Sequence, residues 1–236
     1  RFGGWHADHF DSAIYYSQVY NSMALKYWIE YFRSLKGICS GTLYWKFNDP
    51  AADCAKGGIF PSHMSVIDMF GQPKMTYYYT RRAYEDFLVC CTEKKDAFRI
   101  HACSELTEEI KGTLHITHMD FKGKVILEKS MACTAAADST TLLAEFPGCT
   151  FAVKDKYEEY FRIRFDTSGC EYENRYFFAD ICEINRLKHP PAGLRIRKAS
   201  FEDGNIRLYL YTENFARSVR LRLSDRSAGF ADNYFD

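Results

Sequence analysis

The sequence lacks three features that would each indicate a class of protein. Its 31 basic residues equal its 31 acidic residues, so no overall field favours a polyanion such as nucleic acid or an anionic membrane. No apolar run approaches the roughly 20 residues that a membrane-spanning helix needs. No two cysteines have the CxxC spacing of a zinc site. We therefore expect a soluble globular protein with no nucleic-acid or membrane partner, no metal and no cofactor.

The cysteines also lack a regular framework. There are nine of them, an odd number, and two are adjacent at Cys90 and Cys91. Such a set is typical of free thiols in a reducing compartment, so the sequence predicts a cytoplasmic location. Adjacent strand residues point to opposite faces, which makes Cys90 and Cys91 poor partners for each other.

Apolar and aromatic residues, in contrast, are abundant, at 47% and 17% of the chain. A chain of 236 residues with this composition can bury a sizeable core and hold more than one domain. It opens on Arg1 without an initiator methionine or a signal sequence, and it stops at Asp236 directly after an aromatic run. We therefore expect a piece of a longer polypeptide.

The first third of the sequence alternates helical and extended patterns. Asp11 or Ser12 is a suitable N-cap for a helix of about six turns that ends near Gly37. Gly41–Pro50 predicts a short buried strand that ends in an Asn-Asp-Pro break, and Met75–Tyr84 predicts a second helix. The apolar stripe of the first helix, which we expect to be buried, consists of Ile14, Val19, Met23, Trp28, Phe32 and Leu35. Helix, strand, loop and helix is the repeat of a (β/α)8 barrel, in which the loop after each strand carries the chemistry.

After Asp86 the apolar period changes from 3.6 to 2, which indicates strands. Their number and their polar or glycine-containing turns favour an immunoglobulin-like sandwich. A stiff linker at residues 188–193 precedes three more strand patterns, at residues 194–199, 205–212 and 218–223, which are too few to close a second sandwich. The seven strands predicted for the sandwich are Phe87–Thr92, Phe98–Cys103, Gly112–His118, Val125–Met131, Thr140–Phe146, Tyr160–Phe165 and Tyr176–Ile184.

Histidine, cysteine and aspartate offer little support for a metal site. Asp53, Cys54 and His63 lie in one irregular loop, but one residue of each type at irregular spacing is usually a coincidence. His115 and His118 are three residues apart in a predicted strand, so they lie on opposite faces and cannot form a simple pair.

Several motifs resemble glycoside hydrolase family 2, and in particular its β-mannosidase branch. The motifs are Tyr16-Ser17-Gln18-Val19, the Leu43-Tyr44-Trp45 strand with Asn48-Asp49, residues 65–74 and 77–84, and the terminal runs 214–219 and 230–236. The resemblance implies a multidomain chain. Residues 1–86 would be the last unit of a (β/α)8 catalytic barrel, residues 87–188 an immunoglobulin-like β-sandwich, and residues 189–236 the start of a second β-sandwich.

The same resemblance implies retaining hydrolysis of terminal β-linked sugars, most closely β-mannosides. Two carboxyl groups about 5 Å apart act as nucleophile and as acid/base in that mechanism. The family's two glutamates would lie upstream of Arg1, so this chain contains no catalytic residue and depends on the upstream part of the same polypeptide. The substrate-binding residues that the resemblance implies are Trp45, whose indole would stack on the sugar, and Asn48 and Asp49, which would hydrogen-bond sugar hydroxyls or brace the loop.

Alternatives remain open from sequence alone. A strand tryptophan is most often a core residue, but the family resemblance and the place of Trp45 at the end of its strand favour substrate contact. Asn48-Asp49-Pro50 is also an ordinary turn signal, so for Asn48 and Asp49 bracing ranks ahead of sugar contact. The loop from Pro50 to His63 departs from the mannosidase pattern, which leaves exo-β-glucosaminidase, β-galactosidase and β-glucuronidase specificities possible. A non-catalytic carbohydrate-binding or structural β-sandwich protein is the alternative outside enzymes.

Overall fold

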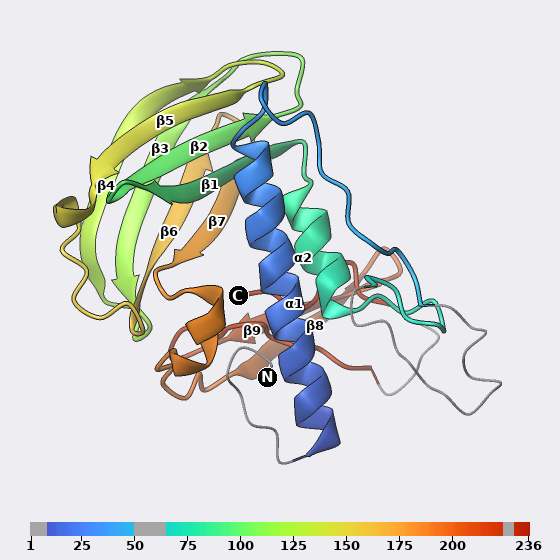
Figure 1. Cartoon of the computed structure of the whole chain (residues 1–236). Helices are drawn as coiled ribbons and strands as arrows, with labels where there is room; N and C mark the ends of the chain where they lie inside the picture. Colours follow the sequence, from blue (N-terminus) through green and yellow to red (C-terminus); the bar gives the residue numbers. More distant parts are fainter. Residues whose placement is uncertain (1–8, 50–64, 224–228) are drawn as a thin grey trace.

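The computed structural model describes residues 9–49, 65–223 and 229–236, and it places two helices beside a β-sandwich (Figure 1). Helix α1 spans Phe10–Arg33 and α2 spans Met75–Ala83. The N-cap of α1 is His9, so the helix begins slightly earlier than predicted. It also ends earlier, and Gly37 lies in the turn beyond it with a φ of 96°, a conformation that favours glycine. Neither described helix combines the length and apolarity needed to cross a membrane.

Seven antiparallel strands form the sandwich, in one sheet of three and one of four. This three-plus-four division is that of an immunoglobulin-like domain, as the sequence predicted. The three-stranded sheet has the order β1-β2-β5 and the four-stranded sheet the order β4-β3-β6-β7. The strands are β1 (Phe87–Lys94), β2 (Ala97–Ser104), β3 (Ile110–Asp120), β4 (Val125–Ala135), β5 (Thr140–Pro147), β6 (Glu159–Asp166) and β7 (Glu171–Phe177).

Strict alternation along β3 and β6 places their apolar side chains between the two sheets. Leu114 and Ile116 of β3 are fully buried, and Phe161 and Ile163 of β6 pack into the same core. The prediction that His115 and His118 lie on opposite faces of their strand is confirmed. His118 is fully buried, whereas His115 is partly exposed and hydrogen-bonds Ser130 at 2.8 Å.

The adjacent cysteines also lie on opposite faces, as predicted. Cys91 packs in the main core between the sheets, and Cys90 packs on the other face of β1 with Leu88 and Cys103. The sulfur atoms of Cys90 and Cys103 are 4.0 Å apart, and all cysteines within the described ranges are free thiols.

Six of the seven predicted sandwich strands overlap observed strands, and the seventh prediction is wrong over most of its length. Strand β7 runs over Glu171–Phe177, and Ile181–Arg186 forms the 3-10 helix η3. The carboxylate of Asp180 accepts a hydrogen bond of 2.7 Å from the backbone N–H of Cys182. This cap starts the helical turn and ends the extended chain.

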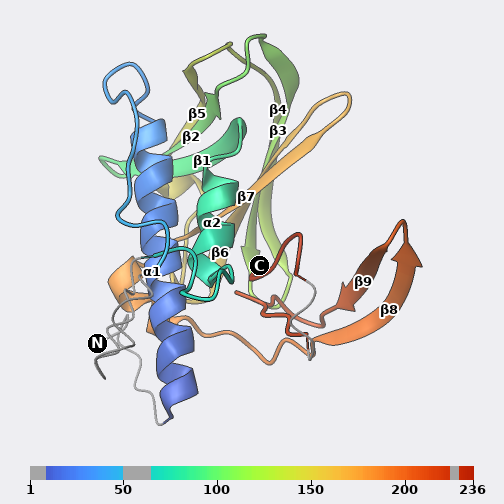
Figure 2. The same ribbon diagram turned by 90° about the vertical axis from the view of Figure 1, so that its right-hand side faces the viewer.

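Helix α1 packs against α2 and against the edge of the sandwich (Figures 1 and 2). Its buried residues include Val19, Met23 and Ile29. The predicted buried stripe is therefore partly wrong, because the side chain of Trp28 is 62% exposed and Ile14 and Phe32 are also exposed.

A buried polar contact links α1 to the sandwich. Glu30, which is not part of the predicted apolar stripe, is buried and forms an ion pair of 2.6 Å with Lys26. The side-chain amide of Asn174 on β7 donates to Glu30 at 2.9 Å and to the carbonyl of Val89 on β1 at 2.8 Å. One amide group thus joins the helix to a strand of each sheet, since β1 and β7 belong to different sheets.

The C-terminal segment begins with a two-stranded hairpin of β8 (Arg195–Glu202) and β9 (Asn205–Tyr211), which projects from the body of the molecule (Figure 2). The predicted third strand at residues 218–223 is reduced to one antiparallel bridge between Val219 and Phe235. A second core lies where the helices, the end of the sandwich and the C-terminal segment meet. Its buried residues are Val19, Met23, Met75, Tyr78, Tyr79, Phe121, Tyr160, Phe177, Ile184 and Tyr234.

Candidate functional site

The stretch that we expected to be a buried strand, Gly41–Pro50, is exposed over most of its described part, to Asp49. Leu43 is fully exposed and Trp45 is 80% exposed. Regular pairing begins only at its end, where the backbone N–H of Asp49 donates to the carbonyl of Ile67 at 3.0 Å and that of Val66 donates to the carbonyl of Phe47 at 3.0 Å. The segment has strand-forming side chains, but among the described residues only its end has a parallel β-bridge, between Asn48 and Ile67.

Behind this pairing, Asp49 is held in a small polar cluster. Its side chain is 9% exposed, and one carboxylate oxygen lies 2.6 Å from Nζ of Lys74. The hydroxyl of Ser65 donates to the other carboxylate oxygen and lies 2.6 Å from the same Nζ atom. Asn48 donates its side-chain N–H to the carbonyl of Asp49 at 3.2 Å. The contacts of Asp49 are those of a residue that braces the segment.

Trp45 lies on the part of the segment that the cluster does not cover. The neighbouring Tyr44 ring lies 6.5 Å from the ring of Tyr84, and the hydroxyl groups of Thr42 and Tyr84 are 2.5 Å apart. The peptide bond between Trp45 and Lys46 is cis. The segment is thus attached on the side of α2, while the indole of Trp45 remains exposed.

Sequence reasoning missed Ser65 and Lys74 as partners of Asp49. Both residues lie in the stretch 65–74, whose motif contributed to the family resemblance, so the signal was present. The sequence alone does not show that residues 65–74 fold back beside Asp49. The loop from Pro50 to residue 64, with Asp53, Cys54 and His63, lies outside the described residues.

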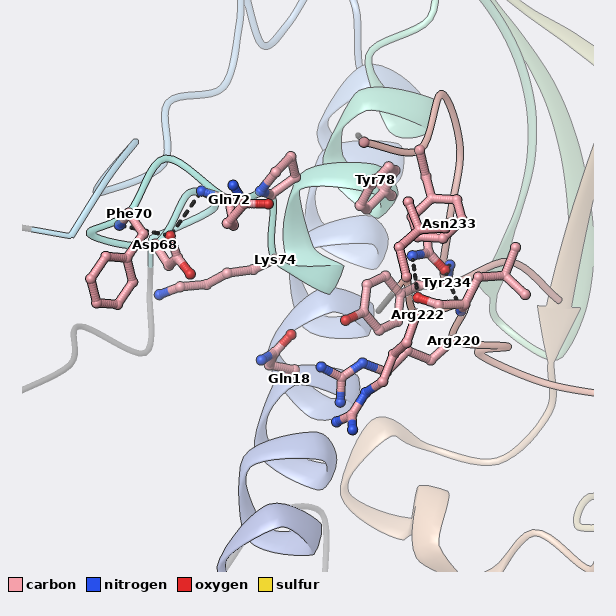
Figure 3. Close-up of a pocket in the computed structure, with 15 residues that line it drawn as sticks. Gln18, Asp68, Phe70, Gln72, Lys74, Tyr78, Arg220, Arg222, Asn233 and Tyr234 are labelled. Carbon is pink, nitrogen blue, oxygen red and sulfur yellow. Dashed lines mark hydrogen bonds between the residues drawn. The ribbon is translucent and has the colours of Figure 1, made fainter. Parts of the chain in front are cut away.

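A pocket of about 600 Å³ lies next to this cluster, between the turn at residues 68–74, the two helices and the C-terminal segment (Figure 3). Lys74 and Asp68 lie at one end, and Arg220 and Arg222 at the other. Asp68 accepts hydrogen bonds of 2.8 Å from the backbone N–H groups of Phe70 and Gln72, which shapes the turn.

Buried carboxylates elsewhere are engaged in structural contacts. The imidazole of His118 lies 2.8 Å from the carboxylate of Glu159, and the rings of Phe151, Phe161 and Phe178 surround it. His118 is fully buried and Glu159 is nearly so, which makes this pair a structural contact of the sandwich. Across residues 9–49, 65–223 and 229–236, no group of three or more His, Cys, Asp or Glu residues is arranged to hold a metal ion.

Burial shifts two histidines in the same direction. The pKa of His101 is lowered to about 4, mainly by burial and also by Arg99. The pKa of His189, whose ring lies 4.3 Å from that of Phe121, is lowered to about 4 by burial and by Arg217. Both rings are therefore neutral at pH 7, and neither lies in the cluster around Asp49.

Comparison with known proteins bears on the fold of the chain. Residues 96–181 match the Mannosidase Ig/CBM-like domain. The structure is similar to the β-D-mannosidase from Dictyoglomus thermophilum, with 25% identity and a TM-score of 0.82, over 99% of this chain and 27% of that one. It is also similar to the exo-chitosanase CsxA from Amycolatopsis orientalis, with 13% identity and a TM-score of 0.65, over 93% of this chain and 28% of that one.

The chain thus spans about a quarter of the length of the solved structures that it matches. No curated protein matches it in a sequence comparison. The likeness to the exo-chitosanase shows the fold alone, whereas the likeness to the β-mannosidase comes with a domain match inside the sandwich. The predicted resemblance of this chain to the β-mannosidase branch of glycoside hydrolase family 2 is confirmed.

Proposed function

We propose that this chain is part of a retaining exo-glycosidase that removes terminal β-linked sugars, with β-mannosides as its substrates. The observation that carries the proposal is the similarity to a β-mannosidase over 99% of the chain. The domain match at residues 96–181 supports the same assignment. Nine cysteines without a disulfide framework favour a cytoplasmic location for the whole protein.

In this proposal residues 1–86 complete a (β/α)8 catalytic barrel, residues 87–188 form the immunoglobulin-like domain and residues 189–236 begin a second one. Several large apolar side chains within residues 9–49 are exposed, which supports the assignment of the first part, because exposed apolar surface often marks an interaction site. These side chains are Phe10, Trp28, Tyr31, Ile38, Leu43 and Phe47. The upstream part of the same polypeptide would cover them and would supply the two catalytic glutamates.

Trp45 would form one wall of the sugar site. An indole face matches the flat C–H surface of a pyranose, and a wall of this kind holds the ring as it flattens toward the oxocarbenium-like transition state. Asp49 would act indirectly, since its contacts with Lys74 and Ser65 hold the segment that carries Trp45. Asn48 would donate to a sugar hydroxyl or support the same turn.

A second candidate is exo-β-glucosaminidase activity. The fold similarity to the exo-chitosanase supports it, since that protein was solved with a β-D-glucosamine derivative. The stacking wall and its brace would serve either sugar, because they contact the ring and not a particular substituent.

The test is a side-by-side assay of the complete protein on aryl β-mannoside, β-glucosaminide, β-galactoside and β-glucuronide. NMR spectra at early times would record the anomeric configuration of the first product. We expect the fastest turnover on the β-mannoside and a β-configured product. Preference for another sugar would contradict the specificity, and an α-configured first product would contradict the retaining mechanism. Absence of turnover on all four would favour a non-catalytic carbohydrate-binding protein.

A further inference from the structure

We propose that the pocket between the turn at residues 68–74 and the C-terminal segment binds a small organic molecule through an oxyanion group, a phosphate or a carboxylate, held by Arg220 and Arg222. The site goes beyond the proposed glycosidase function and does not depend on it. It combines residues from α1, α2 and the C-terminal segment in one cavity of about 600 Å³.

The backbone that carries the two arginines is fixed. The side chain of Asn233, which is buried, accepts a hydrogen bond of 2.8 Å from the N–H of Leu221 and donates one of 3.0 Å to its carbonyl. Next to it, the N–H of Val219 donates to the carbonyl of Phe235 at 2.8 Å. Residues two apart in an extended chain point to the same side, so this clamp directs both arginines toward the pocket.

The polar groups at this end of the pocket are donors. Figure 3 shows the side chains of Arg220 and Arg222 pointing across the cavity toward Gln18 on α1. The side-chain oxygen of Gln18 already accepts from the backbone N–H of Met75 at 3.1 Å, which leaves its NH₂ group to donate. Burial raises the pKa of Tyr234, although Arg220 and Arg222 oppose the shift, so its phenol also remains a donor at pH 7.

Neither guanidinium is neutralised by a carboxylate among residues 9–49, 65–223 and 229–236. Other arginines of the same region are paired. The guanidinium groups of Arg81 and Arg82 lie 3.2 and 2.7 Å from the carboxylate of Asp232. The guanidinium of Arg220 lies 5.8 Å from the centre of the Tyr234 ring, a contact that leaves its charge without a carboxylate partner. Two such guanidinium groups facing one cavity suit an oxyanion, which can accept bidentate hydrogen bonds from arginine.

The pocket is larger than a free anion such as phosphate needs, which indicates a ligand with an organic body. A cavity of about 600 Å³ lies within the range of small-molecule sites and has room for a hexose-sized body. Phe70, Pro73 and Tyr78 supply apolar or aromatic surface along the other walls. The ligand class is therefore a small organic phosphate or carboxylate, and free phosphate is the alternative source of the same chemistry.

Isothermal titration calorimetry on the complete protein would test this site with four probes, which are glucose 6-phosphate, glucuronate, inorganic phosphate and uncharged glucose. We expect one of the two charged sugars to bind at least tenfold more tightly than glucose. The double variant Arg220→Gln/Arg222→Gln should weaken that binding at least tenfold. The matched control is Arg197→Gln, which removes an exposed arginine of β8 outside the pocket and should leave binding unchanged.

The lysine double variant Arg220→Lys/Arg222→Lys keeps the charge without the fork, so its affinity should fall between those of the wild type and the glutamine variant. Inorganic phosphate that binds as tightly as the charged sugars, and is lost in the glutamine variant, would support the oxyanion site with free phosphate as the source. Binding of none of the three anions would overturn the proposal. So would equal affinity in the wild type and the glutamine variant, or equal affinity for glucose and the charged sugars.

Discussion

The carboxylate of Asp49 and the ammonium group of Lys74 form an ion pair of 2.6 Å that joins the end of the Trp45 segment to the N-cap residue of α2. Both side chains are largely buried. Ser65 hydrogen-bonds both members of the pair. The position of Trp45 relative to the helix therefore depends on this polar cluster together with the short backbone pairing of Phe47 and Asp49.

Replacing Asp49 by alanine should destabilise this region by about 1–3 kcal/mol, because Ser65 and Lys74 lose a buried acceptor. Hydrogen exchange of the Ile67 amide and urea unfolding would measure the loss. Asp68→Ala is the matched control, since the carboxylate of Asp68 accepts from backbone N–H groups of an exposed turn, and its loss should cost about 1 kcal/mol or less. Equal losses in the two variants would contradict a special role for the Asp49 cluster.

Gly112 on β3 should not tolerate a side chain. A Cβ atom there would meet the ring of Phe165 at 2.7 Å and would also meet the carbonyl of Asp166. We expect Gly112→Ala to cost about 1–3 kcal/mol through overpacking. Gly169→Ala is the control, because a Cβ atom there meets nothing within 4 Å. Thermal unfolding of both variants would decide, and a harmless Gly112→Ala would show that the neighbouring strands β3 and β6 adjust to the added methyl group more easily than the packing indicates.

The thiols should differ sharply in reactivity. Cys149, Cys170 and Cys182 are exposed, whereas burial raises the pKa of Cys91 well above its ordinary value. Labelling of the native protein with iodoacetamide, followed by mass spectrometry, should modify the three exposed cysteines at least about tenfold faster than Cys91. Thiol titration of the denatured protein without reductant should report most of the nine cysteines. Four disulfides would contradict the predicted reducing compartment.

Stability should fall in mild acid because of His101 and His189. Their pKa values are about 4 in the folded protein, against an ordinary value of about 6.5, so the unfolded chain binds more protons between these limits. The free energy of unfolding should therefore decrease as the pH falls from about 6.5 toward 4. Urea unfolding at pH 7, 6 and 5 should show a shallower decrease for His101→Gln/His189→Gln. An unchanged slope would mean that neither histidine contributes.

The sequence predicted the sandwich well where alternation is strong, as at Leu114 and Ile116 on β3. The strand prediction was wrong at β7. Two aromatic residues of this strand, Tyr172 and Tyr176, pack against the core between the sheets, and the residue midway between them is the polar Asn174. Asn174 is buried and donates hydrogen bonds to Glu30 and to the carbonyl of Val89. Glu30 lies 144 residues away in the sequence and the contact is polar, so no local apolar pattern predicts that Asn174 is buried. The aromatic run after Tyr176 looked more strand-like but is interrupted by the Asp180 cap.

The candidate site was predictable in part for a similar reason. Motifs placed Trp45, Asn48 and Asp49 together because they are close in sequence. The partners of Asp49 required the return of the chain at Ser65 and Lys74, which local patterns do not show. Arg220 and Arg222 alternate with apolar residues as a solvated strand face does, and only the folded chain brings them opposite Gln18.

The central claim is that Trp45 forms a wall of the sugar site, and the turnover number of Trp45→Ala on an aryl β-mannoside tests it most directly. Trp28→Ala is the control, because Trp28 is also largely exposed but lies on α1. In the complete protein we predict that Trp45→Ala lowers kcat about 10- to 100-fold with little change in Tm, through lost transition-state contact. Trp28→Ala should lower Tm, because the upstream part of the polypeptide would cover this side chain in the complete protein, and should leave kcat nearly unchanged. A collapse of Tm in Trp45→Ala with wild-type kcat in the protein that remains folded would contradict the account.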